Sequence, residues 1–186
     1  HILSPLTVPL EHRLLAWSQV EADEEMDWKT FAIAMMVFSL IGIIFLFVLQ
    51  LAQAALPFNP AGVGPPSWDL ALNTAVSFVS NTNWQAYAGE TGVSYLTQMV
   101  GLCVQNFTSA ATGMAVLVGL TYGLSRRSSS TIGNFWVLLI RSVMILLPIS
   151  VIIALILVSQ GTVQTLPGPV TVPLLDPVRD ASGVLV

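Results

Sequence analysis

The sequence predicts an all-α membrane protein with three membrane-spanning helices and one short helix between the first two. Of its 186 residues 54% are apolar and only 9% are charged, and the mean hydropathy is +0.78. Three apolar stretches are each long enough to cross a bilayer, which takes about 20 helical residues. They cover residues 30–56, 91–125 and 131–159.

The composition excludes several classes of protein. Six Lys and Arg against ten Asp and Glu give a net charge of -4. Without a basic stripe, no nucleic-acid partner is expected. Two histidines and the single Cys103 provide too few ligands for a zinc or iron site, and no internal disulfide. Because the chain opens at His1 without Met or a signal-peptide pattern, we interpret it as an internal part of a longer protein.

The three stretches differ in polarity. The first, 30–56, has no charge, and the second, 91–125, carries several amides and hydroxyls that must meet protein or water. The third, 131–159, contains Arg141 in its first half and Pro148 near its middle. We expect Arg141 to extend toward the membrane surface without needing a partner.

Basic residues indicate the orientation of the spans. Lys and Arg occur at 13, 29, 126 and 127 and nowhere in 57–90. The positive-inside rule therefore predicts that 1–29 and the 126–130 loop are cytoplasmic, and that the 57–90 loop is external. The predicted units are the 1–29 segment, a span, pore-loop and span repeat over 30–125, the 126–130 loop, a further span over 131–159 and an extracytoplasmic tail over 160–186.

The loop between the first two spans contains a short helix. Pro65 and Pro66 stop the preceding structure, Ser67 is a typical N-cap, and Asp69 suits a first helical turn. A helix from Trp68 to Phe78 would extend about 16 Å, too short to cross a bilayer. We therefore expect it to enter the membrane and turn back.

The residues after this helix form turns rather than helix. Ser80, Asn81, Thr82 and Asn83 are four consecutive polar residues, and such backbone is tolerated at membrane depth only inside protein or along a cavity. A short helix followed by inward carbonyls is the half-unit of a cation pore. The alternative is an external loop with the short helix on the surface. The T-V-G-Y-G filter of common potassium channels is absent, so a simple channel subunit is a poor match.

Three segments resemble one family. Residues 59–116, with SWDLALNTAVSFVSNTNWQAYAGETGVSYLTQMVGLCVQNF at their centre, are similar to the A subunit of the Kdp potassium-transporting ATPases. The segments MDWK at 26–29 and RRSSSTIGNFWV at 126–137 extend the resemblance to about 26–160. The resemblance implies a multi-pass protein of a bacterial or archaeal plasma (inner) membrane, built from potassium-channel-like repeats. It also implies that this chain holds the first repeat and the opening span of the second.

The resemblance also implies a function. The A subunit is the potassium-binding and translocating pore of an ATP-driven, high-affinity uptake pump, and potassium ion is its ligand. A separate P-type B subunit hydrolyses ATP, with C and F subunits completing the complex in the lipid bilayer. This chain is then no enzyme by itself, and it has neither a D-K-T-G-T sequence nor a phosphate loop.

The implied site follows by position. Ser80, Asn81, Thr82 and Asn83 resemble one of four filter strands that coordinate potassium mainly through carbonyls, and Gln85 corresponds to the outer-mouth glutamine. Glu90 is a second outer-mouth candidate, because its charge would concentrate cations, but this role stays open.

Other hypotheses remain. One is a gradient-driven potassium channel or symporter pore of the same superfamily, and another is a non-conducting membrane scaffold for assembly. Gln98, Gln105 and Thr112 are spaced by seven residues, which on an α-helix places them on one face. That face either borders the ion path or makes interhelical hydrogen bonds.

Overall fold

The computed structural model describes residues 4–126 and 129–168, and these residues form helices and loops without a strand. The all-α prediction is confirmed. Three helices are long and apolar enough to cross a membrane: Trp28–Ala55, Thr97–Ser125 and Phe135–Ser159. In chain order the elements are α1 (Ser4–Trp17), α2 (Trp28–Ala52), the 3-10 turn η1 (Gln53–Ala55), α3 (Trp68–Val79), α4 (Gly89–Gly92), the π-helix η2 (Thr97–Cys103), α5 (Val104–Ser125) and α6 (Phe135–Ser159).

The spans begin at different residues from those predicted, for local reasons. α2 begins at Trp28 because the Asp27 carboxylate accepts a 2.9 Å hydrogen bond from the Thr30 amide and caps the helix. The second span begins at Thr97 rather than residue 91, since Val93 is extended after the short α4. The third begins at Phe135 rather than residue 131, because Asn134 is its N-cap.

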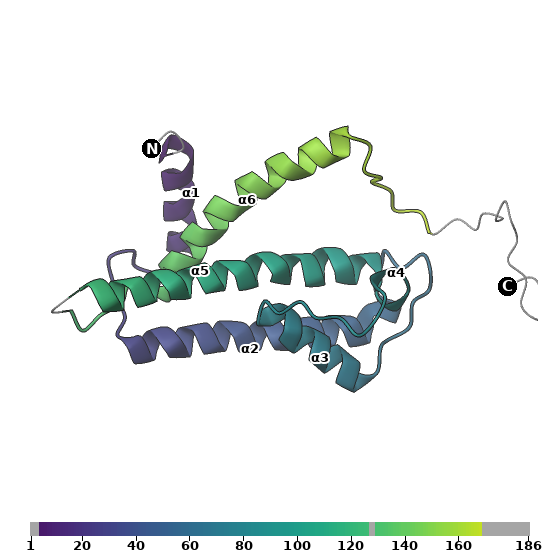
Figure 1. Cartoon of the computed structure of the whole chain (residues 1–186), viewed down its shortest axis with the longest axis horizontal. Coiled ribbons are helices and arrows are strands. Elements are labelled where there is room, and N and C mark those ends of the chain that lie inside the picture. The colour runs from purple at the N-terminus through teal and green to yellow at the C-terminus, as the bar shows by residue number, and fades with distance from the viewer. Residues whose placement is uncertain (1–3, 127–128, 169–186) are drawn as a thin grey trace, which may run out of the picture.

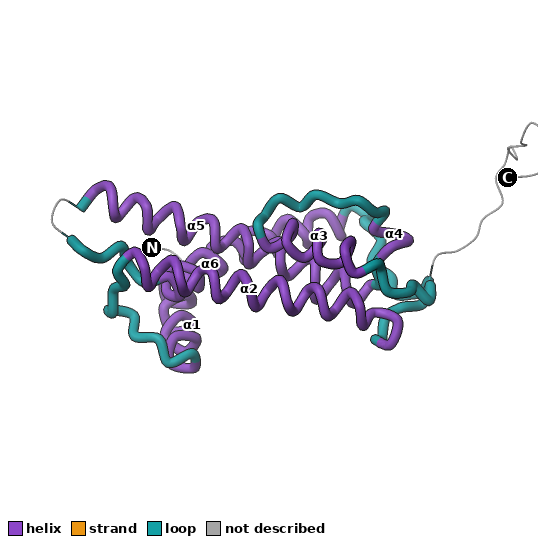
Figure 2. The backbone as a smooth tube through the Cα atoms, turned by 90° about the horizontal axis from the view of Figure 1, so that it is seen from below, coloured by secondary structure: helices purple, strands orange, loops and turns teal. Residues whose placement is uncertain are grey.

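Two hydrophobic clusters hold the helices together. α2 and α5 run in opposite directions, with α3 against α2 at one end and α6 against α5 (Figures 1 and 2). Phe31 and Phe135 meet edge to face at 5.5 Å in the first cluster, between α2, α5 and α6. The second cluster joins α2, α3 and the start of the second span through Leu46, Ala75, Phe78, Val93 and Leu102.

α6 packs on the rest of the chain only near its beginning. Its buried residues lie between Phe135 and Ser142, whereas most of the large apolar side chains from Ile145 onward are exposed. In Figure 1 the helix accordingly leans away from α5 toward its C-terminal end.

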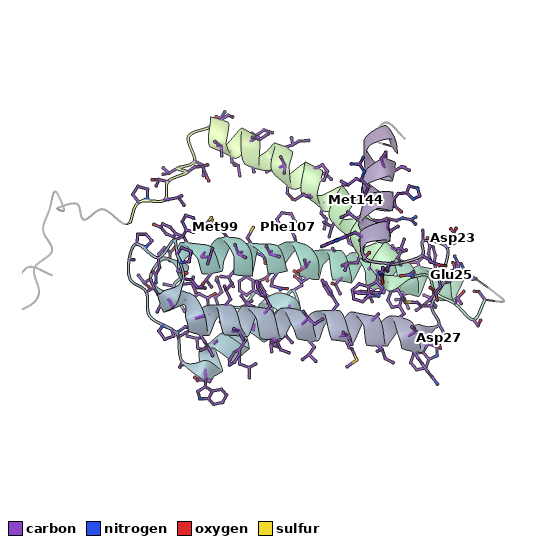
Figure 3. All side chains as sticks on the ribbon, turned by 180° about the vertical axis from the view of Figure 1, so that it is seen from behind. Asp23, Glu25, Asp27, Met99, Phe107 and Met144 are labelled. Atoms are coloured by element: carbon purple, nitrogen blue, oxygen red, sulfur yellow. The ribbon has the colours of Figure 1, made fainter. Side chains whose placement is uncertain are left out.

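The segment before α2 is bonded to the turn before α6. The Met26 amide donates to the Gly133 carbonyl at 2.9 Å, and the Ile132 amide donates to the Met26 carbonyl at 3.0 Å. Glu25 pairs with Arg126 at 2.8 Å and accepts a hydrogen bond from Thr131. Figure 3 places Asp23, Glu25 and Asp27 together at one end of the molecule and Met99 near the other. The two connections thus share one end of the bundle, and their cytoplasmic location stays a prediction.

Hydrogen bonding at this junction favours the ionised form of Glu25. The Thr131 hydroxyl and then the Arg126 guanidinium lower the pKa of the Glu25 carboxyl below its ordinary value. Because the pKa is lowered by folding, this contact stabilises the fold above the ordinary glutamate pKa. The stabilisation is lost as the pH falls through the lowered value.

Helix α1 was not predicted, because the sequence indicated only a cytoplasmic segment over 1–29. It lies against the beginning of α6 and brings Glu11 to Arg141, whose guanidinium donates to the Glu11 carboxylate at 2.8 Å. The expectation that Arg141 needs no partner was therefore wrong. In the predicted tail, residues 160–168 form no helix, and 169–186 lie outside the described residues.

Asn134 offers a test of the junction. Its Oδ1 accepts from the Trp136 and Val137 amides, and its Nδ2 donates to the Glu24 carbonyl at 2.9 Å. We expect Asn134→Ala to lower the free energy of unfolding by about 1 to 2 kcal/mol, because the cap and the connection to Glu24 are both lost. Asn134→Asp keeps the cap and should lose less. Thermal unfolding of the detergent-solubilised protein measures both, and equal losses would contradict the capping role.

Candidate functional site

Helix α3 lies against α2 and directs its C-terminus at the 80–83 loop, defined as Ser80 to Asn83. Its start at Trp68 was predicted, and it ends at Val79, one residue later than expected. The buried Gln50 side chain of α2 donates to the Ala71 carbonyl at 3.0 Å and ties the two helices together. At 12 residues α3 extends about 18 Å, too little to cross a bilayer.

The N-terminus of α3 is partly as predicted. Ser67 occupies the N-cap position, but its hydroxyl makes no capping hydrogen bond to an amide. Asp69 lies in the first turn, where hydrogen bonds from the Ser67 hydroxyl and from backbone amides lower the pKa of its carboxyl. This environment explains Asp69 as a residue that stabilises the helix terminus.

The backbone amides of the 80–83 loop all bond back to α3. The pattern is a Schellman cap, in which the two amides after the cap residue reach carbonyls three and five residues earlier. The expected non-helical backbone is confirmed. Ser80 donates to the Val76 carbonyl at 3.0 Å, Asn81 to that of Phe78 at 3.3 Å, and Thr82 and Asn83 to that of Ser77 at 2.9 and 3.2 Å.

Two asparagines in the loop have left-handed backbone. Asn81 has φ 60° and Asn83 has φ 55°. This conformation is usual for glycine at the residue after a helix cap, and asparagine is among the few other residues that tolerate it. The loop can therefore turn sharply without a glycine.

The carbonyl oxygens of the same loop differ from its amides in their hydrogen bonding. In the part of the chain that the structure describes, no hydrogen bond ends on a carbonyl of residues 80–83. The side chains of the loop are exposed. Because the backbone amides are used and the carbonyls accept no bond from the described residues, the backbone of the loop presents acceptors without donors. Such a surface suits a cation and disfavours an anion.

Side chains connect the loop to itself and to α5. The hydroxyls of Ser80 and Thr82 lie 3.0 Å apart, and the Ser109 hydroxyl of α5 donates to Asn81 Oδ1 at 3.2 Å. These contacts leave the loop carbonyls free.

The two outer-mouth candidates lie in different surroundings. Gln85 is exposed, and its Nε2 donates to the Tyr87 hydroxyl at 3.1 Å. Glu90 lines an open pocket of about 350 Å³ together with Asn59, Tyr95 and Gln98, and no residue of the 80–83 loop lines that pocket. Gln85 thus follows the 80–83 loop closely along the chain, whereas Glu90 lines a pocket that the loop does not reach.

The sequence analysis missed Gln53, which joins three segments around α3. Its side chain is fully buried, donates to the carbonyls of Gly64 and Gly92 at 2.6 and 3.2 Å, and accepts from the Ser94 amide and the Thr97 hydroxyl at 3.1 and 3.2 Å. A sign of this role was available. Gln50 and Gln53 are polar residues three apart near the end of an otherwise apolar stretch.

The prediction that Gln98, Gln105 and Thr112 share one helix face is wrong for Gln98. Residues 97–103 are π-helical, with more residues per turn, so seven positions no longer bring Gln98 above Gln105. Gln98 donates to the carbonyls of Gly89 and Val93 at 3.1 and 3.3 Å. Among the described residues, Gln105 and Thr112 bond within α5, so the choice between an ion path and interhelical hydrogen bonds stays a prediction for them.

The fold and the loop define a class of protein. In the described residues, three helices long and apolar enough to span a membrane, with a short helix and a loop between the first two, are the architecture of an all-α membrane protein. Residues 1–182 match the family described as the potassium-transporting ATPase A subunit. The chain belongs to this family.

Curated relatives agree with this assignment. The potassium-transporting ATPase potassium-binding subunit of Methanoregula boonei is 64% identical over 99% of this chain and 32% of the relative. Those of Herpetosiphon aurantiacus and Sorangium cellulosum are 54% and 51% identical, over 96% and 98% of this chain and 31% and 32% of the relatives. The chain spans about a third of the length of these relatives.

Gln53 gives a testable prediction about the support of the site. Gln53→Leu keeps the side-chain volume but leaves four polar groups without their partner, at a cost of about 1 to 3 kcal/mol for each one that stays unsatisfied. Gln50→Leu is the matched control, because Gln50 is equally buried but contacts only two carbonyls, both within helices. Thermal unfolding should show a clearly larger loss for Gln53→Leu. A smaller loss than for Gln50→Leu would contradict this account.

Proposed function

We propose that this chain forms the first filter repeat of the potassium-binding and translocating subunit of an ATP-driven potassium uptake pump. The carbonyls of Ser80, Asn81, Thr82 and Asn83 supply one part of the potassium filter, and Gln85 lies at its outer mouth. Potassium is the transported ion rather than a cofactor of a reaction in this chain.

One observation carries the proposal. Four consecutive amides, those of residues 80–83, donate to carbonyls of α3, while the carbonyls of the same four residues accept no hydrogen bond from residues 4–126 and 129–168. In a filter, carbonyl oxygens replace the hydration shell of the ion. The C-terminal end of α3 adds partial negative charge close to the same loop. The relatives are potassium-binding subunits by name, which supports potassium as the cation.

The remaining parts of the pump are proposed from the family. ATP hydrolysis belongs to a separate P-type B subunit, and C and F subunits complete the complex. The protein lies in the plasma membrane of a bacterium or archaeon as a multi-pass subunit. The 24–27 segment and the 129–134 turn face the cytoplasm, which is supported by their shared end of the bundle and by Lys29 and Arg126 beside them.

Substitutions in the loop test the function. The test measures rubidium uptake against competing potassium and sodium, by the complete complex reconstituted with ATP around the full-length subunit that carries these residues. We expect Asn83→Ala to raise half-saturation and to lower discrimination against sodium about tenfold, because alanine disfavours the left-handed backbone. Asn83→Gly permits that backbone and should stay closer to the native subunit.

Thr82→Ala removes the hydroxyl beside Ser80 and should also change discrimination. Thr121→Ala is its control, because the Thr121 hydroxyl bonds only to the Leu117 carbonyl in its own helix. If the loop variants impair assembly and leave ion preference unchanged, the loop is a scaffold element. If uptake continues without ATP down a potassium gradient, a gradient-driven pore is the better description.

A further inference from the structure

Ser77 hydrogen-bonds to the 80–83 loop through its carbonyl and to Trp84, the residue after the loop, through its hydroxyl. It is buried, with 7% of its surface exposed, and lies in the last turn of the helix. Its carbonyl accepts from the amides of Thr82 and Asn83 at 2.9 and 3.2 Å, and from the Ser80 hydroxyl at 3.2 Å. One carbonyl thus holds the backbone of the second half of the loop and the Ser80 side chain.

The hydroxyl of the same residue holds the backbone of Trp84, which directly follows the loop. Ser77 Oγ accepts from the Trp84 amide at 2.7 Å and donates to the Trp84 carbonyl at 3.0 Å. The Trp84 side chain is 59% exposed, so the indole ring is not what fixes this position. A two-way hydrogen bond to the backbone does so instead. Ser77 therefore fixes the backbone from Thr82 to Trp84, where the loop ends.

We propose that Ser77 is a positioning residue of the filter loop, which acts by holding the backbone of Thr82, Asn83 and Trp84 and contacts no ion itself. The inference rests on the proposed function of the 80–83 loop. Its physical basis is that a carbonyl site discriminates between cations only if its oxygens keep their spacing, and Ser77 restrains that spacing from one side. The start of the loop is held separately, by the bonds of the Ser80 and Asn81 amides to α3 and by the contact of Asn81 with Ser109.

Substitutions at Ser77 distinguish the contribution of its hydroxyl from that of its carbonyl. Ser77→Ala removes the two bonds to Trp84 and leaves the carbonyl bonds in place. Ser77→Thr keeps a hydroxyl and should restore function. Ser142→Ala is the matched control, since Ser142 is 5% exposed and its hydroxyl bonds only to the Leu138 carbonyl of its own helix.

The experiment uses the full-length subunit in the complete reconstituted complex, with rubidium, potassium and sodium as probes. We expect Ser77→Ala to raise the half-saturating potassium concentration about tenfold and to weaken discrimination against sodium, on the scale of one or two lost hydrogen bonds. The maximal rate per assembled complex stays near the native value. Ser77→Thr and Ser142→Ala keep the native selectivity.

Other results would overturn the inference. A purely structural serine would lower only the amount of assembled complex, with half-saturation and discrimination unchanged. If Ser77→Ala does not assemble, Ser77→Cys keeps the size with a weaker hydrogen-bonding group and should show a smaller shift of the same sign. Failure of both to assemble, or no shift in Ser77→Cys, refutes the positioning role.

The loop variants show which idea has failed. If Asn83→Ala changes discrimination and Ser77→Ala does not, only the inference about Ser77 is wrong. If neither changes discrimination, the proposed filter itself is wrong and the inference falls with it.

Discussion

The need to satisfy backbone amides at the end of α3 governs the rest of this structure. A helix terminus leaves carbonyls without partners, and the loop that follows leaves amides without partners. Here the two sets meet, because four amides of the 80–83 loop turn back onto the last carbonyls of α3. The geometry that completes the helix also leaves the loop carbonyls unpaired. Structural stability and a cation-attracting surface therefore arise from one set of hydrogen bonds.

This arrangement requires a well-supported short helix. Twelve residues are marginal for an isolated helix, so α3 depends on tertiary contacts. Leu46, Ala75 and Phe78 bury its apolar side, while Gln50 and Gln53 satisfy polar backbone groups that water cannot reach. The first span thus has two functions. It is long and apolar enough to cross a membrane, and its last two turns hold the short helix that precedes the loop.

Much of the fold was predictable because it depends on local composition. Apolar length revealed the three spans, and Pro66 with Ser67 revealed the start of α3. Helix α1 was not predictable, because Pro9 disfavours a helix interior and the contact of α1 with α6 is distant in sequence. The π-helix and the contacts of Gln53 also depend on partners far along the chain. The loop residues were named from resemblance, but the left-handed asparagines that shape it needed coordinates.

The one-sided packing of α6 has a mechanical consequence. Leu146 still packs against the cluster of α2 and α5, while the helix continues to Ser159, so about 20 Å of α6 extends beyond this contact among the described residues. A rotation of about 10° at the packed end displaces the far end by about 3 Å on that length. The packed end lies where the segment before α2 is bonded to the turn before α6. A small movement at this junction is therefore amplified at the Ser159 end of the helix.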